Sequence, residues 1–522
     1  MNPVTKLVED FELAFRDEDE LDAVLVDRKL KPDEKYPARE HARAVAKQLG
    51  VKEGVIFLPG QTSTTHEDSD QAVSFRQGRY FYYLSGLDFP DCMVTYDISR
   101  DALFAWISRP RTGRDVIFNG PSPTREEVNA IADFEEVHYT SSLLYYLKPW
   151  GNGRSGKVYL LHARHEPYIK PSRRLKDGTI EYLKHYYFNT TVLKPAMDAA
   201  RAIKSPYEIE LIRKANNITA QAHINVLRGM RKFKNEAEIE AIFAATCISR
   251  QAKQQAYEII AASGSNASTL HYGANNESLE GRQLVCLDAG CEWKCYASDV
   301  TRTFPVSGQW TPQAKEIYDL VARMQDECIA MVKPGADYRE IHMHAHKVAI
   351  EGLMELGLLH NGTFEELYSS GVSLAFFPHG LGHFMGLEVH DVGPGGNLLY
   401  SFEEKVADWD AAYFEMARTP KVANPSVLEP NMVITVEPGI YFSKYALQDV
   451  YLRDPKFAKY INKDLLDRYY PVGGVRIEDD LLVTEDGYEN LTKVPKGDEA
   501  LRIINDSGTP VVDEPEKRGW LW

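Results

Sequence analysis

The sequence lacks any apolar run that is long enough to cross a membrane. A transmembrane helix needs about 18 or more consecutive, mainly apolar residues, and no run in the chain approaches that length. Residues 1–20 also lack the apolar centre that a signal peptide requires. Both absences predict a cytoplasmic protein that does not interact with a membrane.

Basic charge and cysteine are scarce as well. The chain has 60 Lys and Arg against 76 Asp and Glu, which gives a formal net charge of −16 at pH 7. Proteins that bind nucleic acids generally present a basic surface, so we expect no nucleic-acid partner. The 6 cysteines follow no regular spacing, which indicates reduced thiols rather than a disulfide framework.

The length of the chain indicates more than one domain. A chain of 522 residues is too long for one compact core, and its 44% hydrophobic and 26% charged residues are ordinary for a globular protein. We expect an N-terminal domain over residues 1–200, a larger domain over 201–505 and a C-terminal tail over 506–522.

Short apolar runs and helical patterns alternate in the first domain. Residues 37–50 and 122–134 have the spacing of helices. Between them and after them, short apolar runs bounded by Gly, Pro or Asp are typical of strands; these are residues 54–60, 81–86, 92–98, 102–107, 115–120 and 157–163. The alternation predicts an α/β domain with a partly parallel sheet and no catalytic cluster.

Two proline-containing helix starts mark the second domain. Ser205-Pro206-Tyr207-Glu208 is a capping box with proline at the first helical position. Thr311-Pro312 begins a second helix, which we expect to stop by Lys333-Pro334-Gly335. Two long helices that flank an antiparallel sheet would form an α+β layer.

Two aspartates lie in a segment that is typical of an antiparallel hairpin. Residues 284–306 (LVCLDAGCEWKCYASDVTRTFPV) form two runs rich in β-branched and aromatic residues. A hairpin centred between Trp293 and Lys294 places Asp288 opposite Asp299. Carboxylates that face each other repel unless a cation lies between them, so this segment alone indicates a metal site.

Further candidate ligands follow in apolar segments. Histidines occur in PHGLGHFMGLEVHD, and the strand-like runs MVITVEPGIYF and GVRIEDDLLV each carry a glutamate. Four carboxylates and one imidazole form an oxygen-rich set that suits two divalent ions, with two carboxylates bridging them. This set is Asp288, Asp299, His383, Glu437 and Glu478.

The order of these motifs resembles that of a known enzyme family. DAG, DVTRTF, HGLGH, VHD, VEPG and RIED occur in this order within the second domain. The series is similar to the pita-bread metallopeptidases, in the branch that holds Xaa-Pro aminopeptidase and Xaa-Pro dipeptidase (prolidase). The resemblance implies an α+β fold, with a C-terminal pita-bread domain preceded by a smaller α/β N-terminal domain.

The resemblance also implies a role for each ligand. Asp299 and Glu478 would bridge two divalent metal ions, commonly Mn²⁺ in this family, while Asp288 would hold one ion and His383 with Glu437 the other. A hydroxide bridging the ions would attack the peptide carbonyl, with Glu437 as general base. His390 and His271 would bind the carbonyl or the oxyanion, His379 would support proline binding, and Arg476 would hold the surrounding carboxylates.

Several of these residues have other interpretations. A buried, hydrogen-bonded histidine has the same appearance in a sequence as His271, His379 or His390, and Arg476 can simply balance its acidic neighbours. His342 and His346 share a helical face, but no carboxylate accompanies them at a suitable spacing. We therefore do not expect a metal at that pair.

Within the family, the choice lies between longer peptides and dipeptides. The long segment between Glu437 and Glu478 is similar to eukaryotic prolidases. Prolidases, however, tend to carry an arginine just before the strand of Glu437, which binds the free carboxylate of the dipeptide. Here the spacing differs, and the nearest basic residues are Arg418 and Lys421. EKYPAREHARAVAK and SFRQGRYFYYLSG are most similar to fungal Xaa-Pro aminopeptidases. We therefore predict removal of the N-terminal residue from peptides with proline second, prolidase being the alternative.

Other members of the fold family are weaker alternatives. Methionine aminopeptidases lack a large N-terminal α/β domain, creatinases have lost the metal carboxylates, and non-catalytic pita-bread binding modules typically lose ligands too. All of the ligands are retained here. The resemblance implies a small peptide as substrate and a homodimer.

Overall fold

The structure is a computed structural model that describes residues 34–151, 156–167, 172–174, 180–182, 188–394, 396, 398–399 and 427–506. The predicted tail beyond residue 506 lies outside these ranges, as do Arg418 and Lys421. No helix in the described ranges is long and apolar enough to cross a membrane.

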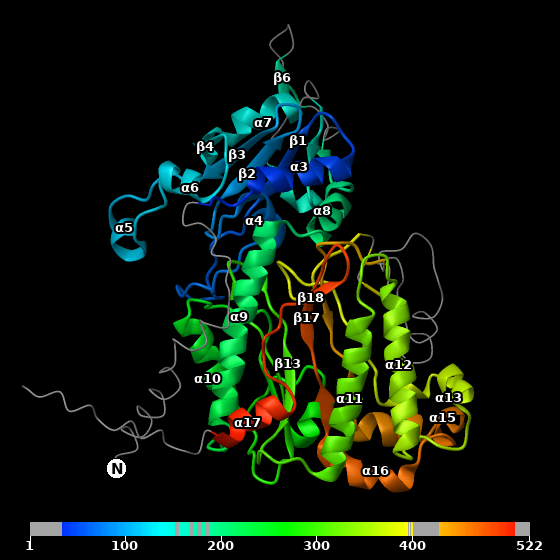
Figure 1. The fold of residues 1–522 in the computed structure, drawn as a ribbon. Helices are drawn as coiled ribbons and strands as arrows, with labels where there is room; N and C mark the ends of the chain where they lie inside the picture. Colours follow the sequence, from blue (N-terminus) through cyan, green and yellow to red (C-terminus); the bar gives the residue numbers. More distant parts are fainter. Residues whose placement is uncertain are drawn as a thin grey trace, which may run out of the picture.

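A six-stranded mixed sheet forms the centre of the N-terminal domain, in the order β4-β3-β2-β1-β5-β8 (Figure 1). β1 pairs antiparallel with β2 and parallel with β5, so the predicted partly parallel sheet is present. The strands are β1 (Val55–Pro59), β2 (Met93–Asp97), β3 (Ala102–Ile107), β4 (Glu136–Tyr139), β5 (Val158–Tyr159) and β8 (Phe188–Asn189), and a separate hairpin joins β6 (Ser172–Arg174) to β7 (Ile180–Tyr182).

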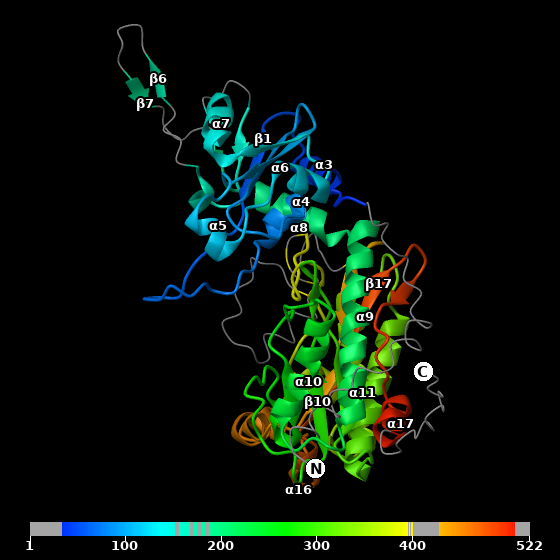
Figure 2. The same ribbon diagram turned by 90° about the vertical axis from the view of Figure 1, so that its left-hand side faces the viewer.

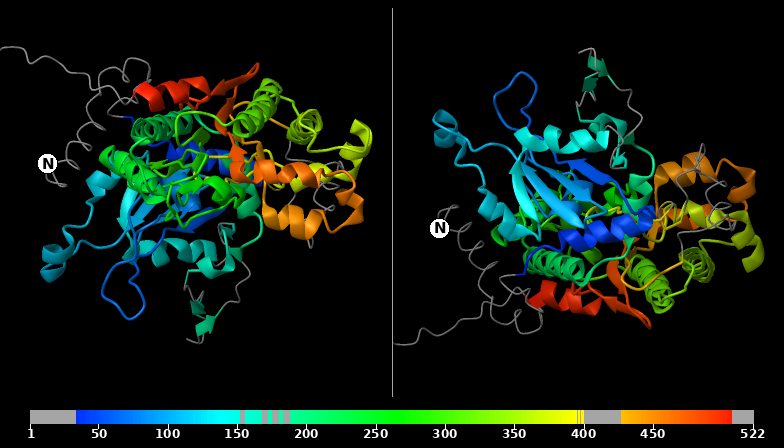
Figure 3. Two further views of the ribbon diagram at one scale, coloured as in Figure 1. Left: turned by 90° about the horizontal axis from the view of Figure 1, so that it is seen from below. Right: turned by 90° about the horizontal axis from the view of Figure 1, so that it is seen from above.

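Helices cover both faces of this sheet (Figure 3). Because alternate residues of a strand point to opposite faces, Ile56 and Leu58 of β1 pack into the cluster that contains α3, while Val55 and Phe57 pack against α7. The helices are α3 (Ala38–Leu49), α5 (Arg114–Asn119), α6 (Arg125–Ile131), α7 (Leu143–Gly151) and α8 (Leu193–Ala202).

Two of the expected strands are helices. Residues 81–86 fall in α4 (Arg79–Ser85), which is buried on all sides, and residues 115–120 fall in α5, which buries none of its side chains. Both strand predictions were wrong because a short apolar run carries no period that distinguishes a helix from a strand. Gly86, at φ 65°, ends α4 in the left-handed conformation that favours glycine.

The capping box predicted at Ser205 begins the first helix of the larger domain. Ser205 Oγ accepts a hydrogen bond from the Glu208 amide, and the Glu208 side chain accepts one from the Ser205 amide. α9 (Pro206–Gly229) starts there, after α8 has carried the chain past residue 200. The domain boundaries themselves stay a prediction.

Long helices flank the strands of the larger domain (Figure 2). α9 packs against α10 (Glu236–Ser249), and α11 (Pro312–Ala330), which starts at the expected Thr311 cap, packs against α12 (Tyr338–Glu355). Smaller helices follow toward the C-terminus: α13 (Phe364–Ser370), α15 (Pro455–Ala458), α16 (Lys463–Tyr469) and α17 (Asp498–Asp506).

Short antiparallel sheets between these helices carry the candidate ligands. They pair in the orders β13-β10-β9, β11-β12, β14-β17-β18 and β15-β16. Their strands are β9 (Ile260–Ser263), β10 (Leu284–Asp288), β11 (Glu292–Trp293), β12 (Tyr296–Ala297), β13 (Thr301–Pro305), β14 (Val433–Val436), β15 (Gly439–Tyr441), β16 (Gly474–Arg476), β17 (Asp479–Val483) and β18 (Tyr488–Asn490). β10, β13, β14 and β17 are buried along their whole length, so the ligands at their ends lie beside the interior of the domain.

Candidate active site

Asp288 and Asp299 lie on a hairpin whose register differs from the prediction. Asp288 ends β10 and pairs with Thr301 rather than with Asp299. The turn is centred between Lys294 and Cys295, which both have positive φ angles, 48° and 66°, as a tight two-residue turn that follows the twist of the strands requires. The expected centre between Trp293 and Lys294 was wrong by one residue.

Tyr257 nevertheless joins the two aspartates. Its hydroxyl oxygen lies 2.6 Å from Asp288 Oδ1 and 2.6 Å from Asp299 Oδ1. Both residues are less than one-tenth exposed. The hairpin therefore presents two buried carboxylates to one side of the site, as the sequence predicted, although the two residues are not directly opposite each other.

His383 and Glu437 come from two segments that run beside each other. The His383 carbonyl accepts from the Thr435 amide at 3.0 Å, and the Leu381 carbonyl accepts from the Glu437 amide at 2.8 Å. His383 Nε2 lies 3.3 Å from both Asp299 Oδ2 and Glu437 Oε1. Its Nδ1 lies 3.0 Å from the Phe384 carbonyl, a contact that fixes the ring and directs Nε2 toward a metal ion.

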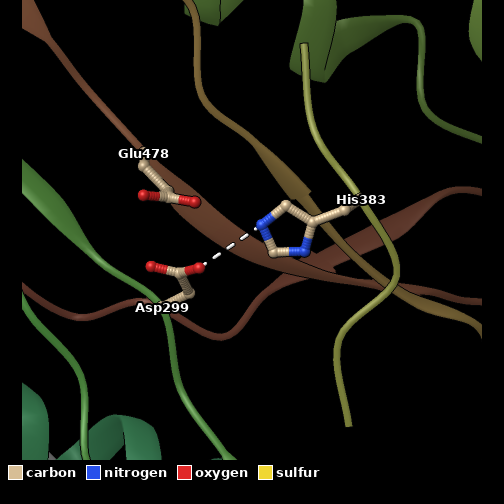
Figure 4. Close-up of side chains that lie close together, drawn as sticks. All are labelled: Asp299, His383 and Glu478. Carbon is tan, nitrogen blue, oxygen red and sulfur yellow. Dashed lines mark ion pairs between the residues drawn. The ribbon is translucent and has the colours of Figure 1, made fainter. Parts of the chain in front are cut away.

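Glu478 completes the cluster from the link between β16 and β17. The Thr301 hydroxyl donates to Glu478 Oε2 at 2.7 Å. Oε1 is buried and has no hydrogen-bond partner among the described residues. Ligand atoms of Asp299, His383 and Glu478 lie within 4.8 Å of one another, and Figure 4 shows these side chains pointing toward one another.

The electrostatics of the cluster favour a bound cation. Burial and the neighbouring acids Asp299, Glu437 and Asp288 raise the pKa of Glu478 well above its usual value. Burial likewise raises the pKa of Asp299 to about 6, although His383 opposes the shift. For Glu437, burial is outweighed by the charge of His383, and its pKa falls to about 2.

The same acids act on His383. Burial lowers the pKa of the imidazole, but Asp299 and Glu437 outweigh burial and raise it well above its usual value. The buried ligand set therefore contains more carboxylates than positively charged groups. Divalent ions are bound in such environments in proteins. The orphaned Glu478 oxygen and the oxygen-rich donor set both fit the implied metal ions.

Arg476 links the cluster to His379. One Arg476 nitrogen donates to Asp288 Oδ2 at 2.6 Å, and another donates to the Tyr441 hydroxyl at 2.9 Å. The same hydroxyl lies 2.8 Å from His379 Nε2. Arg476 therefore holds the Asp288 carboxylate in place, as predicted, and Tyr441 connects it to the histidine.

His390 and His271 lie on the exposed side of the cluster. The His390 ring centroid is 4.3 Å from that of His383. The charge of His383, followed by burial, lowers the pKa of His390 to about 4, and His271 contributes in the same direction. Both residues are exposed, so both are available to a substrate that approaches His383.

Comparison with known proteins identifies the family. Residues 210–485 match the metallopeptidase family M24, and residues 38–159 match the aminopeptidase P N-terminal domain. The chain belongs to metallopeptidase family M24. This assignment confirms the resemblance and the fold class that the motifs implied.

Relatives of this M24 chain extend over nearly its full length. A probable Xaa-Pro aminopeptidase of Sclerotinia sclerotiorum is 59% identical over 522 aligned residues, covering 97% of this chain and 94% of the relative. One of Botryotinia fuckeliana is 57% identical over 528 aligned residues, covering 98% and 95%. These relatives support the predicted enzyme class over methionine aminopeptidase, creatinase and a non-catalytic module.

Solved aminopeptidases share the fold. Aminopeptidase P of E. coli with the inhibitor Pro-Leu has a TM-score of 0.72 at 26% identity, covering 91% of this chain and 99% of that chain. The aminopeptidase of Pseudomonas aeruginosa has a TM-score of 0.70 at 28% identity, with the same coverage. The predicted architecture is therefore confirmed along the M24 chain.

Several residues of the M24 site were not found from the sequence. Tyr257 precedes β9 and has no motif around it. Thr301 and Thr435 could have been predicted from their positions in the sequence. Thr301 lies two residues after the ligand Asp299, and Thr435 lies two residues before the ligand Glu437. A two-residue spacing in extended chain puts side chains on one face, and the Thr435 hydroxyl indeed lies 3.4 Å from Glu437 Oε1.

His342 and His346 lie in the core of the M24 domain. Their rings contact each other at 4.7 Å and pack against Phe377. His346 Nδ1 lies 2.9 Å from the Ser373 hydroxyl, and both side chains are fully buried. Ring packing thus accounts for the pair on the α12 face.

Proposed function

We propose that this chain removes the N-terminal residue from peptides with proline in second position, with two divalent metal ions held by Asp288, Asp299, His383, Glu437 and Glu478. The observation that carries the proposal is the buried cluster in which Asp299, His383 and Glu478 offer ligand atoms within 4.8 Å of one another. Curated relatives that align with at least 97% of the chain are named Xaa-Pro aminopeptidases.

The metal ions and the protein side chains have separate tasks. Bound ions would lower the pKa of a shared water and polarise the peptide carbonyl. Asp299 and Glu478 would be the ligands that the two ions share, while Asp288 would hold one ion and His383 with Glu437 the other. Glu437 is 16% exposed, so it can accept a proton from water and pass it to the leaving nitrogen.

Residues at the open side would bind the substrate. His390 lies 4.3 Å from the ligand His383, between ring centroids, where it can donate a hydrogen bond to the oxyanion that forms at the carbonyl. His271 would assist from the same side. His379, which packs against the buried Phe377 at 4.9 Å, would line the surface for the proline ring.

Recognition of proline requires such a surface. The imide nitrogen of an Xaa-Pro bond carries no hydrogen. A peptidase that relies on a substrate N–H therefore loses a contact at this bond and has to bind the ring instead. The E. coli relative binds Pro-Leu as an inhibitor, which supports a small proline-containing peptide as the ligand here.

Four finer points belong to the proposal. Mn²⁺ suits the oxygen-rich donor set. The side chains of Ile117, Phe118 and Tyr145 in the N-terminal domain are apolar and exposed. A second copy of the chain could cover them, which is consistent with a homodimer. All 6 cysteines are free and buried, which agrees with a reducing compartment such as the cytoplasm.

The carboxylate clamp of a prolidase would need Arg418 or Lys421, which lie outside the described residues.

A comparison of two substrates tests the function. We expect the Mn²⁺-loaded protein to hydrolyse a tripeptide Xaa-Pro-Xaa with a kcat/KM at least about tenfold above that for the dipeptide Xaa-Pro, because no carboxylate is needed after proline. Liberated N-terminal amino acid is measured for both peptides, and an Xaa-Ala-Xaa peptide serves as the control.

The opposite preference would identify a prolidase and would make Arg418 the next residue to replace. Hydrolysis of neither proline peptide by protein that binds metal would contradict the proposed substrate class.

A further inference from the structure

We propose that Arg76, in the N-terminal domain, is a positioning residue for the reaction: it holds the loop 385–391, which carries His390, through an ion pair with Glu388. The inference rests on the proposed function, in which His390 contacts the substrate. It assigns the N-terminal domain an indirect part in the reaction, through the position of His390.

The loop 385–391 connects the ligand His383 to His390. The Met385 amide donates to the Val433 carbonyl at 3.0 Å, and the Asp391 amide donates to the Phe384 carbonyl at 2.8 Å. Between these points, the Gly386 carbonyl accepts from the Ala297 amide at 2.8 Å. Backbone bonds thus fix the two ends of the loop, and a further one runs from the Gly386 amide to the Glu388 carbonyl at 3.1 Å. Side chains of the section from Leu387 to His390 make the other contacts that hold it.

The apolar side chains of the loop pack into a hydrophobic cluster that contains residues of both domains. Met385 and Leu387 are 0% and 1% exposed and belong to the same cluster as Tyr82 of α4 and Ala200 of α8. Val389 is partly buried against the same cluster. The loop, which carries residues of the metallopeptidase site, is therefore part of a hydrophobic cluster that both domains share.

Two sets of cations hold the acidic side chains on either side of His390. Asp391 is fully buried between Arg201 of α8, at 2.5 Å, and Lys204, at 3.3 Å. Glu388 accepts two bonds from Arg76, at 2.7 and 3.2 Å. Both sets come from segments that precede α9, so a shift of these segments would move His390.

The Arg76 guanidinium is itself fixed in place. Arg76 also donates to Glu292 at 3.1 Å. The buried Arg79 pairs with the same carboxylate and also lies 3.6 Å from Glu388 Oε1. Glu292 is 5% exposed. Because the Arg76 guanidinium forms hydrogen bonds with both Glu292 and Glu388, it is oriented to hold Glu388 and not to bind substrate directly.

The exposure of this pair makes the proposal testable. The side chains of Arg76 and Glu388 are 47% and 35% exposed, and ion pairs with this exposure contribute little to stability. The buried Glu292 keeps its pair with Arg79, so replacement of Arg76 should leave the fold intact. A loss of activity would then report the position of the loop rather than unfolding.

The experiment compares Arg76→Gln, Arg76→Lys and Glu388→Gln with wild-type metal-loaded protein. We expect Arg76→Gln and Glu388→Gln to lower kcat about tenfold, since displacement of a catalytic group by 1 Å costs up to about a hundredfold. Arg76→Lys should recover part of the loss, because lysine keeps the charge but cannot form both bonds. Arg43→Gln, which breaks the exposed pair with Asp101 in the same domain, is the matched control.

A double-mutant cycle separates positioning from general structure. If Arg76 acts through His390, Arg76→Gln should cause no further loss in a His390→Ala background. Additive losses, or a melting temperature lowered along with kcat, would overturn the proposal.

Hydrogen exchange provides a readout that does not depend on activity. We expect amides of 385–391 to exchange several times faster in Arg76→Gln than in wild type or Arg43→Gln. Unchanged exchange and unchanged kcat would overturn the positioning role. If the wild type does not hydrolyse proline peptides but residues 385–391 exchange faster in Arg76→Gln, the proposed function is contradicted. The proposal that Arg76 holds the loop would still stand.

Discussion

Glu478→Gln is expected to abolish peptide hydrolysis while the protein stays folded. Gln has the size of Glu and can still accept from the Thr301 hydroxyl, which lies 2.7 Å from Oε2. The substitution removes the charge that a bridging carboxylate supplies to two ions. We expect kcat/KM to fall by at least about 10²–10³-fold, the loss that follows removal of one major electrostatic contact.

The stability of Glu478→Gln should not fall with its activity. Burial and three acidic neighbours raise the pKa of Glu478, so the charged form is unfavourable when no cation is bound. A neutral side chain relieves this repulsion. Thermal unfolding of the metal-free variant should therefore occur at or above the wild-type temperature.

Kinetics, elemental analysis and thermal unfolding of the purified variant check this prediction. Glu499→Gln, at an exposed residue of α17, is the matched control and should behave as wild type. Near-normal turnover by Glu478→Gln with its metal content verified would contradict the role of Glu478 as a bridge.

Asp391→Asn is expected to cause the largest loss of stability. The side chains of Asp391, Arg201 and Lys204 are only 1%, 2% and 1% exposed. Removing one partner from a buried ion pair leaves an uncompensated buried charge, which costs about 3–5 kcal/mol. Here one carboxylate serves two cations, so we expect a loss of at least about 3 kcal/mol.

Urea unfolding of the metal-free protein measures this loss. Asp101→Asn is the control, because its pair with Arg43 is 41% and 57% exposed, and exposed pairs contribute about 0–1 kcal/mol. A loss for Asp391→Asn no greater than that of the control would show that Arg201 and Lys204 find other partners.

The sequence allowed much of the fold to be predicted wherever local chemistry decides it. Ser205 and Thr311 begin α9 and α11 because their side chains satisfy free amides at a helix start. β3 spans the expected residues 102–107. α4 and α5 failed because short apolar runs carry no period that separates helix from strand.

The candidate site was predictable to the extent that its residues lie in recognisable motifs. Asp288, Asp299, His383, Glu437 and Glu478 were all named from such motifs, and the structure brings them together. The hairpin register was missed because positive φ at Lys294 and Cys295 is uncommon for such residues. Tyr257 and Arg76 were missed because their partners are distant in sequence.

The most direct test of the metal site is a Mn²⁺ titration of chelator-treated protein, with binding followed by calorimetry and elemental analysis and tripeptide hydrolysis followed in parallel. Five protein ligands around a buried cluster predict two ions per chain and activity that rises with their binding. One ion per chain at full activity, or full activity without metal, would contradict the proposed dinuclear site.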